Sequence, residues 1–282
     1  MKSILFYLIL LLFPSWLFAG GPWTPGKKHG FLQIQATFPA VPYKQLYVSS
    51  GNNLELNRGV TDISIQAFLE YGISEKFSLV TALPFKTVST NNDINLDSEF
   101  PLLPQGSLSG LGNYELALKY KFLDKSFISA FSVKAEFNTG SRDLEKGLAT
   151  GYDATGYSAY WHIGRSFGPK FYSFFESGYT LRTNDFSDDY RMLLETGYQA
   201  ANNLWLALVF DLRQSLRNGN YDDTNLQQTG LYTNNQEFFA FGIKTSYELK
   251  NKFGFSASTF GAFSGNYVAY SATFNVGIFM KW

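Results

Sequence analysis

Apolar residues occupy every second position at the end of the chain, from Tyr270 to Trp282. The residues between them are mostly small or polar, which predicts a strand with one apolar face and one mostly polar face. Such a strand suits the closure of a barrel in lipid, because its outer side chains touch acyl chains while its backbone pairs with the first strand. The positions that we expect to act as a C-terminal assembly signal are Phe274, Val276, Ile278, Met280 and Trp282.

The same period-two alternation recurs along most of the chain. Between residues 61 and 72, Ile63, Ile65 and Leu69 alternate with polar residues. This pattern predicts an all-β fold, a transmembrane antiparallel up-and-down β-barrel of about 12 strands. The predicted strands cover residues 30–39, 61–72, 77–86, 111–122, 130–137, 155–165, 170–183, 190–200, 204–214, 237–249, 252–263 and 270–282.

The connections between these strands alternate in length. Every second link is a tight turn, whereas most of the others are long and rich in Gly, Asn, Asp and Ser, as in residues 40–60, 87–110, 138–154 and 215–236. Short periplasmic turns and longer outer loops are typical of outer-membrane barrels, with both termini on the short-turn side. A soluble all-β sandwich or barrel is the alternative, but strands in soluble proteins usually have about 5 or 6 residues, and those predicted here are longer.

The N-terminal residues predict a secretory signal peptide. Lys2 precedes an apolar stretch from Ile4 to Phe13, and small residues follow at Ala19, Gly20 and Gly21. This order of charge, apolar segment and small residues is typical of a cleaved export signal, although a membrane-anchoring helix is the alternative. We therefore expect residues 1–20 to be a signal peptide and residues 21–282 to form a single barrel domain. Residues 21–29 are expected to be too short for a plug.

Composition favours the membrane interpretation. Aromatic residues make up 18% of the chain, with 28 Phe and 18 Tyr, which aromatic girdles at the two water interfaces would use. The 23 basic and 23 acidic residues cancel, so no basic surface for nucleic acid is expected. The absence of cysteine excludes a lipid-anchored lipoprotein and is compatible with export.

If the apolar faces meet lipid, the opposite faces line a lumen that carries both signs of charge. Eight-stranded barrels are filled by side chains and sixteen-stranded barrels enclose an open pore, so a barrel of about twelve strands should have a narrow or partly occluded lumen. The inward side chains of Tyr160, Tyr172 and Phe68 are expected to restrict it further. Pairing across the lumen is the structural interpretation of these charges, and solute contact is the functional one. The predicted lumen-lining residues are Glu115, Lys119, Lys134, Glu136, Glu176, Arg191, Glu195, Asp211, Arg213 and Lys244.

A search for catalytic chemistry finds little. Only His29 and His162 could serve as a histidine base, and neither has an evident partner in the sequence. Residues 218–225 are rich in oxygen donors but lack the spacing of a calcium loop, so a solvated turn is the simpler interpretation. No phosphate-binding loop or zinc-like spacing is present. We expect no catalytic residues, no metal and no cofactor.

Three runs resemble a family of outer-membrane proteins known as the phenol-degradation meta-pathway or transporter-like family. They are residues 70–79 with Pro84 and Phe85 after them, residues 110–122, and residues 150–156. The second run departs from the family at Asn113, where an Asp is more common. The resemblance implies a transporter of small compounds, aromatic or hydrophobic ones among them, in a Gram-negative outer membrane. It assigns no substrate-binding residue.

The sequence thus favours a passive outer-membrane channel for small molecules with a narrow polar lumen. A structural or surface-interaction barrel with a closed lumen is the second interpretation, and a lipid-modifying barrel enzyme is the third. The expected partners are outer-membrane lipid and lipopolysaccharide, the barrel-assembly machinery and a small-molecule solute.

Overall fold

The computed structural model describes residues 20–49, 51, 53–98 and 100–282. Nearly all of the predicted signal peptide, residues 1–19, therefore lies outside the described residues. No helix in the described part of the chain is long and apolar enough to cross a membrane.

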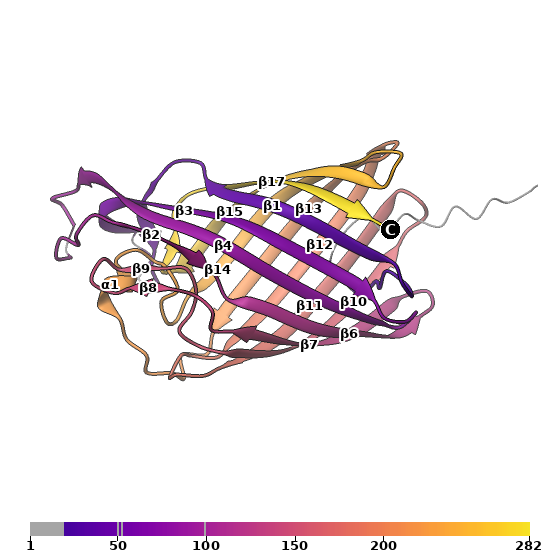
Figure 1. The fold of residues 1–282 in the computed structure, drawn as a ribbon, viewed down its shortest axis with the longest axis horizontal. Coiled ribbons are helices and arrows are strands. Elements are labelled where there is room, and N and C mark those ends of the chain that lie inside the picture. The colour runs from indigo at the N-terminus through magenta and orange to yellow at the C-terminus, as the bar shows by residue number, and fades with distance from the viewer. Residues whose placement is uncertain (1–19, 50, 52, 99) are drawn as a thin grey trace, which may run out of the picture.

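Long antiparallel strands form the barrel wall (Figure 1), which confirms the predicted fold class. The twelve wall strands are β1 (Gly30–Pro39), β3 (Asn53–Gly72), β4 (Phe77–Ile94), β6 (Tyr114–Asp124), β7 (Ile128–Phe137), β10 (Gly156–Ser166), β11 (Phe171–Arg182), β12 (Asp189–Ala201), β13 (Leu204–Ser215), β14 (Glu237–Glu248), β15 (Phe253–Asn266) and β17 (Thr273–Lys281). Successive strands pair with each other, and β1 closes the ring by pairing with β17 from Phe31–Lys281 to Pro39–Thr273.

The long loops contain structure that the sequence pattern did not predict. They hold β2 (Tyr43–Tyr47), β5 (Ser107–Leu111), β8 (Arg142–Asp143), β9 (Leu148–Ala149) and the short helix α1 (Thr224–Gln227), and the short link before β17 holds β16 (Val268–Ala269). Two wall strands, β3 and β4, also begin or end well beyond the predicted ranges of 61–72 and 77–86. The reason is that polar residues in an antiparallel hairpin can continue the backbone ladder outside the membrane, where no apolar alternation is required.

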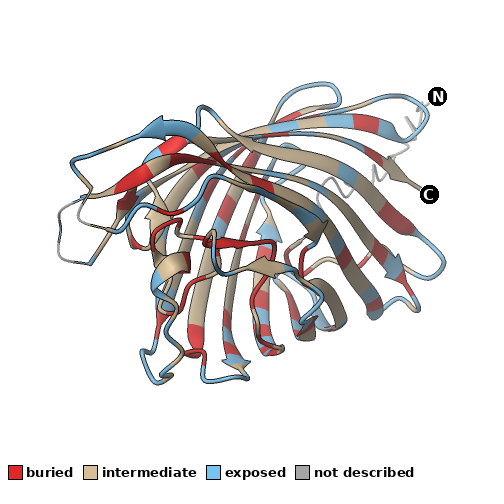
Figure 2. Cartoon of the chain, turned by 60° about the vertical axis from the view of Figure 1, so that its left-hand side comes forward, coloured by how far each residue is buried: buried red, intermediate tan, exposed pale blue. Residues whose placement is uncertain are grey.

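Buried and exposed residues alternate along the wall strands (Figure 2). The outward set is apolar: Ile65, Phe131, Leu208, Ile243 and Ile278 are between 44 and 57% exposed in the isolated chain. A contiguous apolar belt of this kind is explained by contact with hydrocarbon, because a soluble protein would cover it. In β17 the exposed outward residues include Phe274, Val276 and Ile278, and the ring of Trp282 lies against Gly30 at the start of β1.

The closing strand gives a prediction about assembly. Replacing Phe274 with Asp, or removing Trp282, should reduce the fraction of protein inserted into the outer membrane, because a charge or a gap is placed on the lipid-facing side of the β1–β17 seam. Heat-modifiable migration of the membrane fraction measures insertion. An Asp at the outer loop position Tyr270, which precedes β17, is the control and should insert normally. Normal insertion of both altered chains would contradict a role of this strand in assembly.

Candidate functional site

The interior of the barrel is lined by charged residues held in pairs. All ten predicted lumen residues lie at strand positions that face the interior, and each lies within 3.5 Å of an oppositely charged side chain or, for Glu176, of His162. Three pairs join predicted residues to one another: Lys134–Glu115 at 3.1 Å, Arg191–Asp211 at 2.6 Å and Lys244–Glu195 at 2.7 Å. The remaining four pair with residues outside the predicted set: Lys119 with Glu70, Glu136 with Arg182, Glu176 with His162, and Arg213 with Asp189.

The outer part of the lumen holds a charge cluster around Asp189. This carboxylate accepts hydrogen bonds from Arg182 Nε at 3.0 Å and Arg213 Nη2 at 2.8 Å. Both guanidinium groups also lie over the ring of Tyr152, at 4.3 and 5.3 Å from its centroid. Asp189 therefore separates two buried cations that would otherwise repel each other.

His162 has partners that are not evident from the sequence. Its Nε2 lies 2.8 Å from Ser132 Oγ, and its Nδ1 lies 2.9 Å from Glu176 Oε2. A Ser–His–Glu chain can activate a serine, but acyl transfer also needs donors for the developing oxyanion. Ser132 pairs with both neighbouring strands in the middle of the sheet, so its backbone is committed to the ladder. The three side chains are best explained as a structural link between β7, β10 and β11.

One sector of the lumen is uncharged. On β1, β17 and β15, the inward residues form a ladder in which Gln33 donates to Ser256 at 2.8 Å and Gln35 donates to Asn275 at 3.2 Å. A cavity of about 400 Å³ lies between this ladder and the pairs Arg191–Asp211 and Lys244–Glu195. The middle of the lumen is therefore a polar cavity that can hold water. Its neutral wall, the Gln, Ser and Asn ladder, faces a wall of paired charges.

Two of the inward aromatic rings lie against glycines of the neighbouring strands. Gly178 and Gly197 lie where an added Cβ atom would come within 2.0 and 2.1 Å of the rings of Tyr160 and Tyr172. The rings thus cover glycines of the neighbouring strands and lie along the wall, an approach that only glycine allows. Phe68 likewise contacts Phe31 edge to face, at 6.2 Å between centroids.

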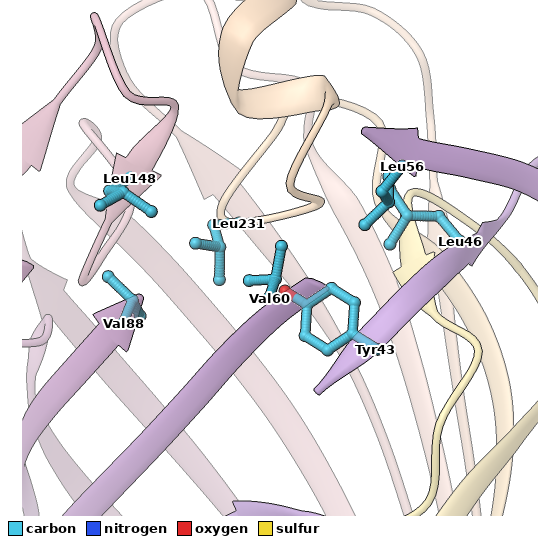
Figure 3. Packing of buried hydrophobic residues seen from close by; sticks show 7 residues of the cluster. All are labelled: Tyr43, Leu46, Leu56, Val60, Val88, Leu148 and Leu231. Atoms are coloured by element: carbon cyan, nitrogen blue, oxygen red, sulfur yellow. The ribbon is translucent and has the colours of Figure 1, made fainter. Parts of the chain in front are cut away.

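The narrow points lie at the two ends. At the outer end, residues of four loops and strand ends meet in an apolar cluster (Figure 3) that contains Tyr43, Leu46, Leu56, Val60, Val88, Leu148 and Leu231. We call this set the mouth cluster. Leu46 and Leu148 have no exposed surface, and the hydroxyl of Tyr43 donates to the carbonyl of Thr229 at 2.8 Å. Burial raises the pKa of the Tyr43 hydroxyl, which stays neutral in this position.

A second loop contact lies beside the mouth cluster. Asp188 accepts hydrogen bonds from Asn218 Nδ2, the hydroxyl of Tyr179 and the backbone N–H of Arg182. Burial works against the charged form, but these donors outweigh it and hold the pKa of Asp188 below its ordinary value. The loop 183–188 is thereby tied to the loop that carries α1.

At the periplasmic end, the segment before β1 folds into the lumen. Trp23 contacts Tyr172 and Phe174 edge to face, each at 5.8 Å, and the carbonyl of Gly21 accepts a hydrogen bond from Lys119. The segment thus contacts the inner wall at this end, which the sequence did not indicate. Even this short segment reaches the inner wall, because it lies directly inside the end of the barrel from which β1 starts.

Sequence reasoning missed both narrow points. Isolated leucines in polar loops, such as Leu46 and Leu148, were the available signal, but nothing in the sequence indicates that they meet. Among the described residues, no group of acids and histidines is placed to hold a metal ion, and residues 218–225 form part of the loop around α1.

Comparisons with known proteins agree with this architecture. Residues 47–277 match the model of a family described as "Putative MetA-pathway of phenol degradation". An outer membrane channel from Pseudomonas putida F1 superposes with a TM-score of 0.72 at 14% identity, over 94% of this chain and 100% of that one. No curated protein matches the chain.

Two further solved structures have the same fold at lower similarity. The NanC porin superposes with a TM-score of 0.55 at 7% identity, over 89% of this chain and 100% of its own. The translocator domain of the autotransporter NalP from Neisseria meningitidis gives 0.50 at 11% identity, over 91% and 89% of the two chains. At these identities the likeness establishes the fold of an outer-membrane barrel.

Proposed function

The chain belongs to the family of the MetA pathway of phenol degradation, and we propose that it is a passive channel for small solutes rather than an enzyme. One observation carries the proposal: the middle of the inner face is polar, and its charges around the cavity form ion pairs with one another. An apolar filled core would serve a barrel that only needs to be stable, whereas a polar interior with a cavity suits passage through water.

Small solutes are the class that this lumen admits. The cavity of about 400 Å³ and the narrow ends suit single small molecules rather than polymers or folded chains. The family's link to phenol degradation supports aromatic or hydrophobic compounds among the solutes. We propose that the ten paired lumen residues together make the lining polar and electrically neutral, and that they do not act as individual solute-binding sites.

A barrel with a closed lumen is the second candidate, because the mouth cluster is tightly packed and apolar. In that function the loops would present a surface, and the ion pairs would only stabilise the wall. The two candidates predict different permeability, which is therefore the property to measure.

The test uses the purified mature protein in planar bilayers and in liposomes. We expect small discrete conductance steps in KCl and swelling of proteoliposomes in urea or phenol that falls off toward sucrose. Heat-denatured protein is the control. Failure of every solute to permeate, with the barrel shown to be folded by heat-modifiable migration, would reject the channel and leave the closed barrel.

Export and membrane partners complete the proposal. Residues 1–20 are proposed to act as a cleaved signal peptide, and the strand that ends at Trp282 to be the segment that the barrel-assembly machinery recognises. Outer-membrane lipid and lipopolysaccharide would then contact the apolar belt.

A further inference from the structure

A polar pocket of about 490 Å³ lies among the outer loops, and it shares no lining residue with the lumen cavity. Its walls come from three separate loops: Ser49 after β2, the residues around α1, and Asn266 with Tyr267 before β16. In Figure 1, α1 and β2 lie at the end of the barrel opposite the C-terminus. The pocket therefore faces the side on which solutes and cell-surface molecules arrive.

The pocket is held in shape by contacts between its loops. Arg217 donates to Ser49 Oγ at 2.8 Å and to Glu237 at 3.1 Å. The backbone N–H of Ser49 donates to Asn266 Oδ1 at 3.1 Å, and Asn266 Nδ2 donates to the carbonyl of Asn235 at 2.7 Å. Three loops distant in sequence are thus fixed around one space, which is the preorganisation that a binding site requires.

Backbone strain is concentrated at the same place. Arg217, Asn235 and Tyr267 all line the pocket and all have positive φ angles, of 53°, 57° and 53°. This conformation is unfavourable for residues other than glycine, and most of all for a bulky side chain such as tyrosine. Strained residues persist where the surrounding structure fixes them, and they collect at functional sites.

Polar groups in the pocket remain free. Among the contacts of the described residues, none engages the side-chain amide of Asn220, the hydroxyl of Tyr221 or the Nη1 of Arg217. The ring of Tyr221 is fixed by stacking on Phe186, with centroids 4.0 Å apart. Asp222 uses Oδ1 to accept from Gln227 and keeps Oδ2 available. The pocket thus offers an amide, a phenol, a carboxylate oxygen and a guanidinium N–H in one place.

The charge of the pocket narrows the class of ligand. Glu237 neutralises Arg217, which leaves Asp222 as the unpaired charge of the lining. An anion such as a phosphate would be repelled, and an apolar molecule would leave the free polar groups without partners. A neutral molecule with several hydroxyl groups satisfies both conditions.

We infer that this outer pocket binds a neutral saccharide ring. Planar amide, carboxylate and guanidinium groups can each bond neighbouring hydroxyl groups of a pyranose, and the tyrosines offer apolar surface to its C–H groups. The ring can come from a free sugar or from the glycan part of lipopolysaccharide, which present the same chemistry. This binding is independent of permeation, so it does not depend on the proposed channel.

Saturation-transfer NMR on the full mature protein in detergent tests the inference. The probes are free glucose, galactose and N-acetylglucosamine in one arm, and lipopolysaccharide with a complete core in the other. Signal from free sugars assigns a soluble ligand, and signal from lipopolysaccharide glycan alone assigns the membrane source. Absence of signal in both arms overturns the inference.

Two substitutions locate any binding that is found. Asn220→Ala and Tyr221→Phe remove free groups without breaking a loop contact, and each should weaken the apparent affinity at least severalfold. Asn202→Ala, in the exposed turn between β12 and β13, is the matched control and should bind like the parent. Equal binding by all variants would place the sugar elsewhere and overturn the assignment, whatever the conductance of the protein.

Discussion

Leu148→Asp should raise the single-channel conductance severalfold. Leu148 has no exposed surface and packs in the mouth cluster with Val88 and Leu231 (Figure 3). An unpaired carboxylate there would cost several kcal/mol to keep buried. The strands of the barrel wall are paired all round the ring, whereas β8 and β9 pair over only two residues each. The loop that carries β8 and β9 should therefore leave the mouth before the wall unfolds.

The same substitution at Leu96 is the control for this result. Leu96 is 90% exposed between β4 and β5, so a carboxylate there meets water and should leave the conductance unchanged. Planar-bilayer recordings of the three proteins make the comparison. An unchanged conductance of Leu148→Asp, with the loop shown by limited proteolysis to be released, would mean that the mouth cluster does not restrict the lumen.

Asp189→Asn should lower the free energy of unfolding by about 3–5 kcal/mol. The neutral amide leaves Arg182 and Arg213 without the carboxylate that separates them. Glu136, 3.5 Å from Arg182, cannot neutralise the charges of both arginines. Urea titration followed by heat-modifiable migration gives the value. Asp93→Asn removes the partner of Lys44 in an exposed pair and should change stability by less than about 1 kcal/mol. Equal effects of the two substitutions would show that the lumen charges are fully hydrated and contribute little.

The fold was predictable because it depends on a local pattern. A residue's place on the lipid or lumen face follows from its parity within a strand, so charges such as Glu195 and Lys244 could be placed on the inner face before their partners were known. The ends of the strands were harder to predict from the sequence. Residues 53–60 have apolar residues at Leu54, Leu56 and Val60, but Arg58 interrupts the alternation, and only their pairing with β2 and β4 shows that they continue the sheet.

The contacts across strands needed register, which parity alone does not give. His162 and Glu176 are direct partners in the β10–β11 pair, and both are equidistant from Pro169 in the connecting turn. Centring the hairpin on that turn would have found the pair. No such local rule joins Leu46, Leu148 and Leu231, because they come from three loops whose meeting depends on closure of the whole barrel.

Single cysteines on β15 test the central claim most directly, since the chain has no cysteine of its own. Ser256 and Ser258 line the lumen cavity, whereas Phe255, next to Ser256, is 55% exposed on the outer side. A charged, water-soluble thiol reagent should reduce the conductance of Ser256→Cys and Ser258→Cys, and it should leave Phe255→Cys unlabelled in lipid. Labelling without this alternation, or labelling of the inner positions with no change in current, would contradict a lipid-embedded barrel with a water-filled passage.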